Sequence, residues 1–568
     1  MEFEQKAEEK KMSMSKNIAR LAVTAGLTAA LSFGGVMAPV TMAFAEDDAD
    51  TITITQSANN GVTNFKAYQI FKADVVDKDG RKVASNVKWA NEKAEAAVLG
   101  VLTAEKVPGI TNSSTAQEVA DYLSTTIMDT TPTTVVKKDD LLNKIARAVE
   151  EAAPSTGQSF TANTQFTAQD KGYYLFMTDT SSIGTKNDHA GRKQTGTSPI
   201  FAVVGGKAVR VTEKTNIPTV EKKVRDDKPG SDWADKADSQ MGQNVEYQLT
   251  GTVAKNVDTF DTYYYQFYDE LSAGLTADEN SVKVNIDGTE INASKFAKNV
   301  SKPDANGKTV LTVTFENLKA AGVNITERSQ VVVTYTAMLD PGKAVVVGGA
   351  GNDNSVKLVY SNNPGHDSMG ESVPDTVRDY TYALKLIKED FDDSTKLKDV
   401  KFTIKATGAD ELESGVEGKQ FVQKNGSLGN TEYVFQTNEN GEISVKGLDA
   451  GTYTVHEVED SNPGYNTLPD FTFTISTVKD DGTDSLKQPE GENTLRVTAS
   501  KSNAALVDEP RFVDDTVILT VKNKKGSGLP LTGLNGVTFT WIAGGAVLCI
   551  GVAHLIRSRK QAEESEQE

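Results

Sequence analysis

Three polar residues in the C-terminal part of the chain continue rows of side chains that strand alternation turns toward an apolar core. Lys388 ends the alternating segment Tyr380–Lys388, Asn523 ends the alternating segment Thr516–Asn523, and Glu457 has the inward parity of its own strand. A buried lysine or asparagine costs free energy unless it pairs or reacts. The same pattern also fits a lysine that snorkels to the surface and an asparagine in a turn, so both explanations stay open.

An amine, a carboxamide and an acid that are buried together could form an amide cross-link. A lysine amine is a nucleophile only when it is neutral, and desolvation in an apolar core lowers its pKa. An acid that keeps its proton polarises the carboxamide, and folding holds the reacting groups together at a high effective molarity. Ammonia leaves once and nothing turns over. The product would restrict the unfolded chain as a disulfide does, but it would resist reduction.

Strand-like segments recur along the chain, and helical spacing is confined to one part of the first region. That part holds three segments rich in Ala, Leu, Glu and Lys, with Ser114 or Thr115 as an expected cap: Asn91–Glu105, Thr115–Met128 and Asp139–Ala153. We therefore predict an all-β chain of tandem immunoglobulin-like sandwiches, the N-terminal one with a helical insertion. The predicted units are a signal peptide at 1–45, a first domain at 46–217, a middle sandwich at 218–376, a third sandwich at 377–526 and a C-terminal tail at 527–568.

The C-terminal tail carries a short motif followed by an apolar run. The motif consists of Leu529, Pro530, Leu531, Thr532 and Gly533. The run Val537–Ile556 is long enough to cross a bilayer's hydrocarbon core, and the basic cluster behind it predicts a positive-inside stop. Motif, span and tail in this order resemble the LPxTG sorting signal of Gram-positive surface proteins, which a sortase transpeptidase cuts between Thr532 and Gly533. The resemblance implies a transient membrane anchor, after which Thr532 becomes an acyl donor that joins the protein to peptidoglycan or to another subunit.

The N-terminal end has the order of a secretory signal peptide. Lys16 and Arg20 precede an apolar stretch that starts at Leu21, and small residues follow up to Ala45. We predict cleavage before Glu46 and a mature chain of Glu46–Thr532. Gly526-Ser527-Gly528 is expected to be a flexible tether that gives a sortase access to the motif.

Composition argues against several classes of function. The formal net charge of −19 disfavours nucleic-acid binding, which needs a basic footprint. The single cysteine, Cys549, lies in the predicted span, so the mature chain can form no disulfide. The four histidines are scattered, and no catalytic or metal-ligand set can be assembled from the sequence. We expect no cofactor, no metal and no turnover enzyme; the acidic clusters fit solvated turns better than calcium loops.

The third sandwich resembles the collagen-adhesin B-type (Cna B-type) domains of Gram-positive pilins, which form an intramolecular Lys–Asn isopeptide bond. Lys388 matches the family's lysine, Asn523 its asparagine upstream of the sorting signal, and Glu457 the acid of its E-box. The threonine that commonly follows this acid is Val458 here.

The middle sandwich resembles the isopeptide-forming middle domain of major pilins. The resemblance implies Lys222 as the lysine, Asn354 as the asparagine and Asp269 as the acid. Neighbouring residues leave alternatives open, and these are Lys223, Asn352 and, further away, Asn362. In the first domain, Lys66 and Asn216 form a weaker candidate pair, because Lys66 also fits a surface lysine.

Polymerisation into a pilus would need an acceptor amine. Pilins of this family place it at the end of the first domain, in a motif that commonly ends Tyr-Pro-Lys. The segment Val209–Lys214 occupies that region without the Tyr-Pro pair. Lys214 is the best candidate, Lys207 comes next, and an ordinary exposed lysine is the alternative.

Three functions are weighed. The leading one is the major structural subunit of a sortase-assembled pilus on a Gram-positive surface, whose partners are a sortase, other copies of the chain, minor pilins and peptidoglycan. The second is a minor pilin or singly anchored adhesin that binds host matrix or carbohydrate through the first domain. The third, a wall-anchored enzyme, lacks a catalytic set.

Overall fold

The protein is described from a computed structural model, and the predicted tail and Lys214 lie outside the residues that it describes. Those residues are 40–44, 50–56, 60–78, 81–124, 136, 139–153, 157–213, 215–226, 230–406, 420–477, 498–502, 504–513 and 516–526. Among them, no helix has the length and apolar character needed to cross a membrane; the predicted span Val537–Ile556 is not part of this set.

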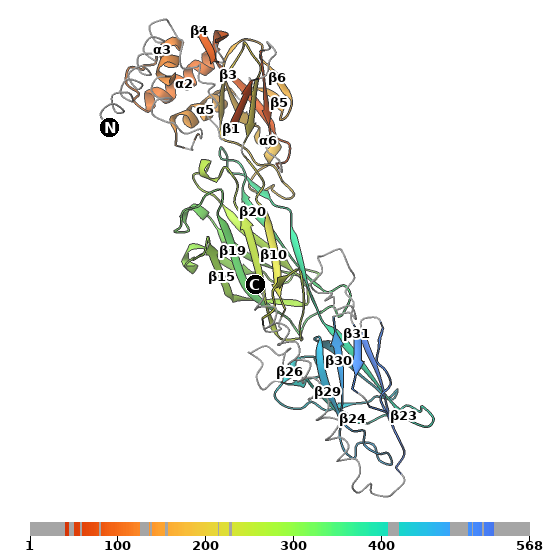
Figure 1. Ribbon diagram of the computed structural model, residues 1–568. Helices are drawn as coiled ribbons and strands as arrows, with labels where there is room; N and C mark the ends of the chain where they lie inside the picture. The colour runs from red at the N-terminus through yellow and green to blue at the C-terminus, as the bar shows by residue number, and fades with distance from the viewer. Residues whose placement is uncertain are drawn as a thin grey trace, which may run out of the picture.

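Strands grouped in pairs of sheets build three successive units along the length of the molecule (Figure 1), so the all-β prediction is confirmed. In the first unit the strands are β1 Val40–Phe44, β2 Thr51–Thr55, β3 Asn64–Lys78, β4 Arg81–Trp89, β5 Gln158–Thr161, β6 Gln165–Thr167, β7 Gly172–Thr178, β8 Ile200–Val204 and β9 Val209–Glu213. One sheet has the order β1-β9-β2-β6 and the other β4-β3-β7-β8, with β5 paired to β3. The apolar side chains of Ile52, Phe65 and Phe176 fill the space between the two sheets.

Helices cover the outer face of the sheet β4-β3-β7-β8, which confirms the predicted helical insertion (Figure 1). They are α2 Glu92–Ala104, α3 Ala116–Tyr122 and α5 Leu141–Ala152; the short α6 Thr180–Ile183 follows β7 and is not part of this cover. Asn91 caps α2 by accepting a hydrogen bond from the Ala94 amide at 2.9 Å. Thr115, one of the two expected caps, forms a capping box with Glu118 at the start of α3.

Strand β1 lies inside the predicted signal peptide. It pairs antiparallel with β9, so that Val40 is opposite Glu213 and Phe44 is opposite Val209. Cleavage before Glu46 would remove this strand and leave β9 at the edge of its sheet. The sequence prediction had not assigned a strand to this segment.

The middle unit is a sandwich of two sheets. Its strands are β10 Val220–Arg225, β11 Trp233–Ala234, β12 Lys236–Asp238, β13 Asn244–Thr252, β14 Tyr265–Leu271, β15 Leu275–Ile286, β16 Thr289–Glu290, β17 Ala297–Val300, β18 Thr309–Phe315, β19 Gln330–Leu339, β20 Asn352–Ser361, β21 Met369–Glu371 and β22 Asp375–Tyr380, with 3-10 turns η2 Val257–Thr259, η3 Ala293–Lys295 and η4 Leu318–Ala320. One sheet has the order β11-β10-β13-β19-β15-β16 and the other β12-β22-β20-β14-β18-β17, with β21 paired to β20. Because β22 pairs with β20, the sheet of the middle unit continues past the predicted boundary at residue 376.

The third unit is a second complete sandwich. Its strands are β23 Tyr382–Asp390, β24 Lys401–Ala406, β25 Phe421–Val422, β26 Leu428–Gly429, β27 Phe435–Gln436, β28 Glu442–Leu448, β29 Gly451–Glu457, β30 Phe471–Ser476, β31 Thr498–Lys501, β32 Arg511–Val513 and β33 Thr516–Asn523. The sheets have the orders β28-β23-β33-β32 and β26-β25-β24-β29-β30-β31, and β27 pairs with β24. The first and last strands, β23 and β33, lie side by side and parallel.

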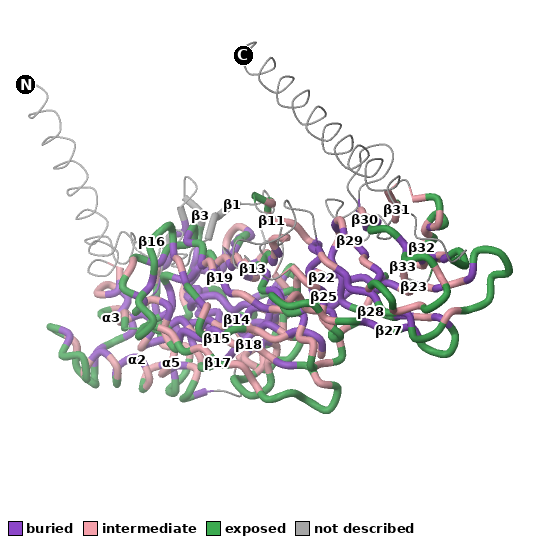
Figure 2. Tube along the Cα trace, turned by 90° about the horizontal axis from the view of Figure 1, so that it is seen from below, coloured by how far each residue is buried: buried purple, intermediate pink, exposed green. Residues whose placement is uncertain are grey.

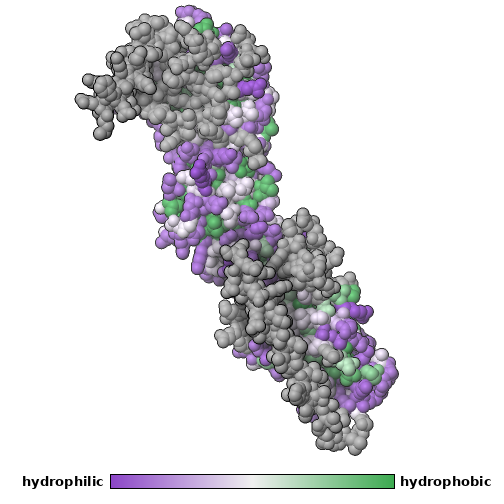
Figure 3. Space-filling model, in the orientation of Figure 1, coloured by the Kyte–Doolittle hydropathy of each residue, from purple (hydrophilic) through white to green (hydrophobic). Residues whose placement is uncertain are grey.

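Burial follows strand alternation in the middle and third units. In β19 and β33 every second residue is buried, and the buried positions form the interior seen in Figure 2. On the face drawn in Figure 3 the coloured surface is mainly hydrophilic, with apolar residues in small separate groups. The core is therefore held between paired sheets, and this places polar residues of inward parity in a water-poor environment.

Polar side chains tie each unit to the next. At the first junction, Glu371 of the middle unit accepts hydrogen bonds from the Gly191 amide at 3.0 Å and pairs with His189 at 3.1 Å. At the second junction, Gln240 accepts a hydrogen bond from the Tyr453 hydroxyl at 2.9 Å. These contacts, together with the direct continuation of β22 into β23, limit the freedom of neighbouring units.

The chain before the predicted sorting motif is pinned to the third unit. The Gly526 amide donates to the Gly464 carbonyl at 2.9 Å, and Lys525 pairs with the buried Asp390 at 3.0 Å. A hydrogen bond from the Tyr465 hydroxyl, with one from a backbone amide, lowers the pKa of Asp390 to about 2. Gly526 therefore belongs to the folded unit, which corrects the prediction that the tether begins there.

Candidate functional site

Lys388, Glu457 and Asn523 meet in the core of the third unit. Lys388 lies near the end of β23 and Asn523 ends the neighbouring β33, while Glu457 ends β29 in the facing sheet. The Lys388 Nζ donates to Glu457 Oε2 at 2.9 Å and to the carbonyl oxygen of Asn523. The Asn523 Nδ2 donates to Glu457 Oε1 at 2.6 Å. The acid thus bridges the amine and the carboxamide nitrogen.

The surroundings of the Lys388 amine are nearly free of water. The side chains of Lys388 and Glu457 are 0 % and 1 % exposed, and the amine lies 5.5 Å from the centre of the Phe402 ring. Burial lowers the pKa of Lys388 to about 8, although the charge of Glu457 opposes the shift. A substantial fraction of this amine is therefore neutral near pH 8, and the neutral form is the nucleophile.

Lys222, Asp269 and Asn354 meet in the core of the middle unit. Lys222 lies on β10 of one sheet, and Asp269 and Asn354 lie on β14 and β20 of the facing sheet. All three residues are 0 % exposed. The Lys222 Nζ donates to both oxygens of Asp269, at 2.6 and 2.7 Å. Burial lowers the pKa of Lys222 to about 8 against the opposing charge of Asp269.

A tyrosine hydroxyl connects the three groups of the middle unit. Tyr335 of β19 donates to Asp269 Oδ2 at 2.6 Å, and it accepts hydrogen bonds from Asn354 Nδ2 at 2.7 Å and from Lys222 Nζ at 3.1 Å. The Tyr335 ring stacks on Tyr247 with centroids 5.3 Å apart. The sequence prediction missed Tyr335, although the alternation in Gln330–Leu339 assigns it to the buried row.

The two sets of residues use different sheet geometry. In the third unit the amine and the carboxamide come from adjacent strands of one sheet, and the acid comes from the facing sheet. In the middle unit the amine faces both the acid and the carboxamide across the sandwich. Each set places an amine, a carboxylic acid and a carboxamide in a dry core. The amine contacts the carboxamide directly in the third unit, whereas in the middle unit the two groups are connected through the Tyr335 hydroxyl.

The alternatives that the sequence left open lie elsewhere. Lys223 pairs with Asp235 at 2.6 Å and is partly exposed. Asn352 bonds to backbone groups of Val346 and Asp379. Asn362 is at the junction with the first unit, where its Nδ2 donates to a backbone carbonyl.

The structure does not bring Lys66 and Asn216 of the first unit together. Lys66 lies 3.6 Å from Asp179, and the Asn216 side chain accepts a hydrogen bond from the Lys255 amide at 2.6 Å. The predicted acceptor Lys214 is outside the described residues, between Glu213 and Thr215. The runner-up Lys207 is described and half-buried.

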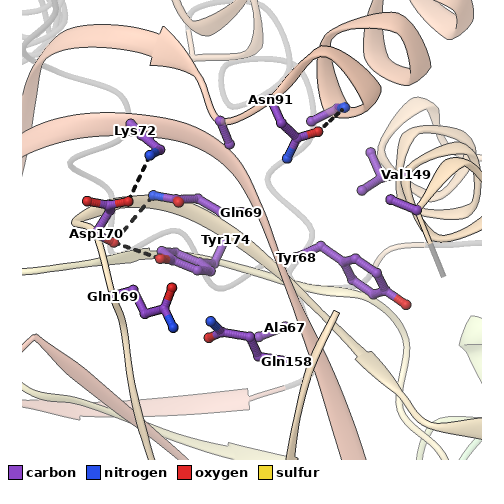
Figure 4. A pocket seen from close by; sticks show the side chains of 13 residues that line it. Ala67, Tyr68, Gln69, Lys72, Asn91, Val149, Gln158, Gln169, Asp170 and Tyr174 are labelled. Carbon is purple, nitrogen blue, oxygen red and sulfur yellow. Dashed lines mark hydrogen bonds and ion pairs between the residues drawn. The ribbon is translucent and has the colours of Figure 1, made fainter. Parts of the chain in front are cut away.

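A crevice of about 210 Å³ lies in the first unit between the sheet and the helices α2 and α5 (Figure 4). Its polar lining includes Gln69, Asn91, Gln158, Gln169 and Asp170. Across the described ranges, no group of three or more His, Cys, Asp and Glu residues could hold a metal ion.

Comparisons with known proteins agree with the sandwich architecture. Residues 382–489 match the sequence model of the SpaA family, described as a prealbumin-like fold domain. This match covers Lys388 and Glu457 but ends before Asn523. No curated protein sequence matches the chain.

Solved structures of major pilins match across most of the chain. The T6 backbone pilin of Streptococcus pyogenes has 16% identity and a TM-score of 0.47, over 85% of this chain and 100% of that one. The major pilin SpaD of Corynebacterium diphtheriae has 16% identity and a TM-score of 0.43, over 84% and 97%. The major pilin SpaA of the same organism has 12% identity and a TM-score of 0.41, over 84% and 100%.

Proposed function

We propose that this chain is the major structural subunit of a sortase-assembled pilus, stabilised by isopeptide bonds Lys388–Asn523 and Lys222–Asn354. The observation that carries the proposal is the buried amine–acid–carboxamide set of the third unit, within a region whose first part matches the SpaA prealbumin-like family. A lysine that merely snorkelled would keep its amine in water, and the Lys388 side chain is fully buried. An asparagine in a turn would not be bonded to the same acid as that amine.

The bond would form by one balanced step. The neutral Nζ of Lys388 attacks Cγ of Asn523, the new Cγ–Nζ bond forms, and the Cγ–Nδ2 bond breaks. Glu457, which bonds to both nitrogens, takes a proton from the attacking amine and delivers one to the leaving nitrogen, which departs as ammonia. In the middle unit Asp269 takes this role, and Tyr335 connects it to the Asn354 nitrogen.

The positions of the two bonds suit a shaft that carries tension. Each bond joins a first-strand lysine to an asparagine on a late strand, 135 positions later in the third unit. A pulling force that enters at Tyr382 would pass along β23 to Lys388, cross the bond to Asn523, and leave through the residues that follow Asn523. The residues between Lys388 and Asn523 would then carry no load.

Intact mass spectrometry of the Glu46–Thr532 fragment tests the proposal. We expect a mass lower than that of the sequence by two ammonias, and lower by only one ammonia in either Lys222→Ala or Lys388→Ala. Lys223→Ala and Lys385→Ala are matched controls on the same strands, and both should keep the full deficit. A wild-type mass equal to the plain sequence would reject both bonds.

Polymerisation is proposed to join Thr532 of one subunit to Lys214 of the next, through a sortase, with final attachment to peptidoglycan. Minor pilins would join the same polymer. Cells that make the Lys214→Arg variant should lose the ladder of detergent-resistant polymers, whereas Lys207→Arg cells should keep it. The opposite pattern would assign the acceptor to Lys207, and an intact ladder in both variants would exclude both lysines.

A second candidate function is a minor pilin or singly anchored adhesin. The crevice beside the helical insertion favours it, because this is a concave polar surface on the unit predicted to meet a ligand. Wall extracts separate a pilus subunit from a singly anchored adhesin: monomers released only by wall hydrolysis would indicate the adhesin, and covalent polymers would indicate a pilus subunit. A ladder made only of repeats of this chain would then indicate the major rather than a minor subunit.

A further inference from the structure

The crevice of the first unit originates from a break along one edge of β3. On that edge, β5 pairs with Asn64–Ala67 and β4 pairs from Phe71 onward. Between these partners, the Ala90 backbone amide donates a hydrogen bond of 3.0 Å to the Ile70 carbonyl. The two edge strands therefore leave a gap, and the start of α2 and the end of α5 border it.

Amide side chains without protein partners line this gap. Figure 4 shows the side-chain amides of Gln158 and Gln169 facing one another, with Asn91 on the side of α2. Within the described part of the chain, the side-chain amides of Gln158 and Gln169 make no hydrogen bond. The side chain of Asn91 uses only its oxygen, which caps α2. Each amide offers donors and an acceptor at fixed spacing, and this matches the hydroxyl groups of a polyol.

The remaining lining is neutral or apolar. Lys72 and Asp170 neutralise one another in an ion pair of 2.8 Å at the rim, so the crevice presents no net charge to a ligand. Ala67, Ala94 and Tyr68 border the crevice but are only 2 %, 3 % and 3 % exposed, so its accessible lining is mainly polar. The Tyr68 hydroxyl is buried without a hydrogen bond among the described residues.

We propose that this crevice binds a single neutral sugar unit of the hexose or N-acetylhexosamine class. Hydroxyl groups on the rim of the sugar ring would bond to Gln158 and Gln169, and Asn91 would donate through its free Nδ2. A charged ligand is disfavoured because the rim ion pair leaves no unbalanced charge to attract it.

The size of the crevice sets the expected affinity. A volume of about 210 Å³ is below the roughly 300–1,000 Å³ of sites that hold drug-sized ligands, so the crevice suits one ring rather than an oligosaccharide. With few hydrogen bonds and partial enclosure, binding should be in the millimolar range. Many subunits along one polymer would multiply this weak affinity by avidity, but the proposal itself does not depend on polymer formation.

Saturation-transfer NMR on the Glu46–Thr532 fragment is the direct test, because it detects weak ligands. The probes are the methyl glycosides of glucose, galactose and mannose, N-acetylglucosamine and, as a charged control, N-acetylneuraminic acid. We expect signal from at least one neutral sugar and none from the charged one. The pattern among the neutral probes separates recognition of ring hydroxyls from recognition of the N-acetyl group.

Variants locate the binding. Gln158→Ala and Gln169→Ala should each weaken binding about tenfold, as loss of one or two hydrogen bonds to a ligand does. Gln165→Ala is the matched control, because Gln165 is on the same unit and is bonded to Thr51 at 2.9 Å. Unfolding temperatures of all three variants should equal that of the parent. No signal from any neutral sugar, or a signal that survives both crevice variants, would overturn the proposal.

Discussion

Removing the acid of the third unit should abolish the cross-link and lower the stability of that unit by a predictable amount. Glu457→Gln keeps the shape of the side chain but cannot take and return a proton, and Lys388→Met removes the nucleophile with little change in volume. Without the bond, the unfolded chain regains the freedom of a loop of 135 positions. The chain-entropy relation gives about 5 kcal/mol for such a loop, and for a unit of roughly 150 residues this lowers the unfolding temperature by about 15 °C.

Calorimetry and intact mass of the same Glu46–Thr532 samples would measure both effects. The unfolding temperature of the third unit should fall in both variants. The decrease that is common to both measures the loss of the bond, because the two substitutions have different side effects. Glu439→Gln is the control, because Glu439 is an exposed glutamate of the same unit that pairs with Lys398 at the surface. The reasoning is refuted if Glu457→Gln still loses ammonia at this site, or if both variants lack the bond and the transition moves by less than about 5 °C.

Three further predictions concern rate and force. Burial lowers the pKa of Lys222 and Lys388 to about 8. The rate of bond formation in freshly refolded chains should therefore rise about tenfold per pH unit below pH 8 and level off above it. Timed mass spectra measure this rate, and a rate that stays constant from pH 6 to 9 would contradict the prediction. Tyr335→Phe should slow formation of the middle bond at least ~tenfold, since it removes the hydroxyl that connects Asp269 to the leaving nitrogen of Asn354. The third-unit bond in the same molecule is the internal control. In single-molecule pulling, the wild-type third unit should not extend, whereas Lys388→Ala should release roughly 450 Å, the contour length of the unlocked segment; equal extension of the two would place the load elsewhere.

The burial of Lys388 and Asn523 could be predicted because the information is local. The parity of Lys388 and Asn523 follows from alternation within single strands, and β33 spans Thr516–Asn523, as predicted. Adjacent parallel pairing of β23 with β33 then brings the two residues together. Thr115 as a helix cap was predictable for the same reason, because a capping box is a pattern of four consecutive residues.

Features that depend on how two sheets stack were not predictable. Tyr335 reaches Asp269 and Asn354 only because β19 faces β14 and β20 across the sandwich, and one strand pattern does not specify that offset. The resemblance indicated Asn354, but the strand pattern alone does not separate it from Asn352, since both asparagines are fully buried. The pinning of Gly526 by Gly464 was missed because it joins residues 62 positions apart, in a loop and a terminal segment without periodicity.

The contrast between the two sites indicates what the proposed cross-links have in common. The third unit brings its amine and carboxamide together within one sheet, and the middle unit does so between sheets. If the purpose were to reinforce a weak sheet contact, one arrangement would be expected to recur. What recurs instead is the position along the chain: a lysine on the first long strand and an asparagine on a strand near the end of the same unit. In both units this joins the point where tension would enter to a point near where it would leave. The shared feature is thus the position of the bond on the path of force through the unit. Whether the two residues meet within one sheet or between sheets follows from the strand order of each sandwich.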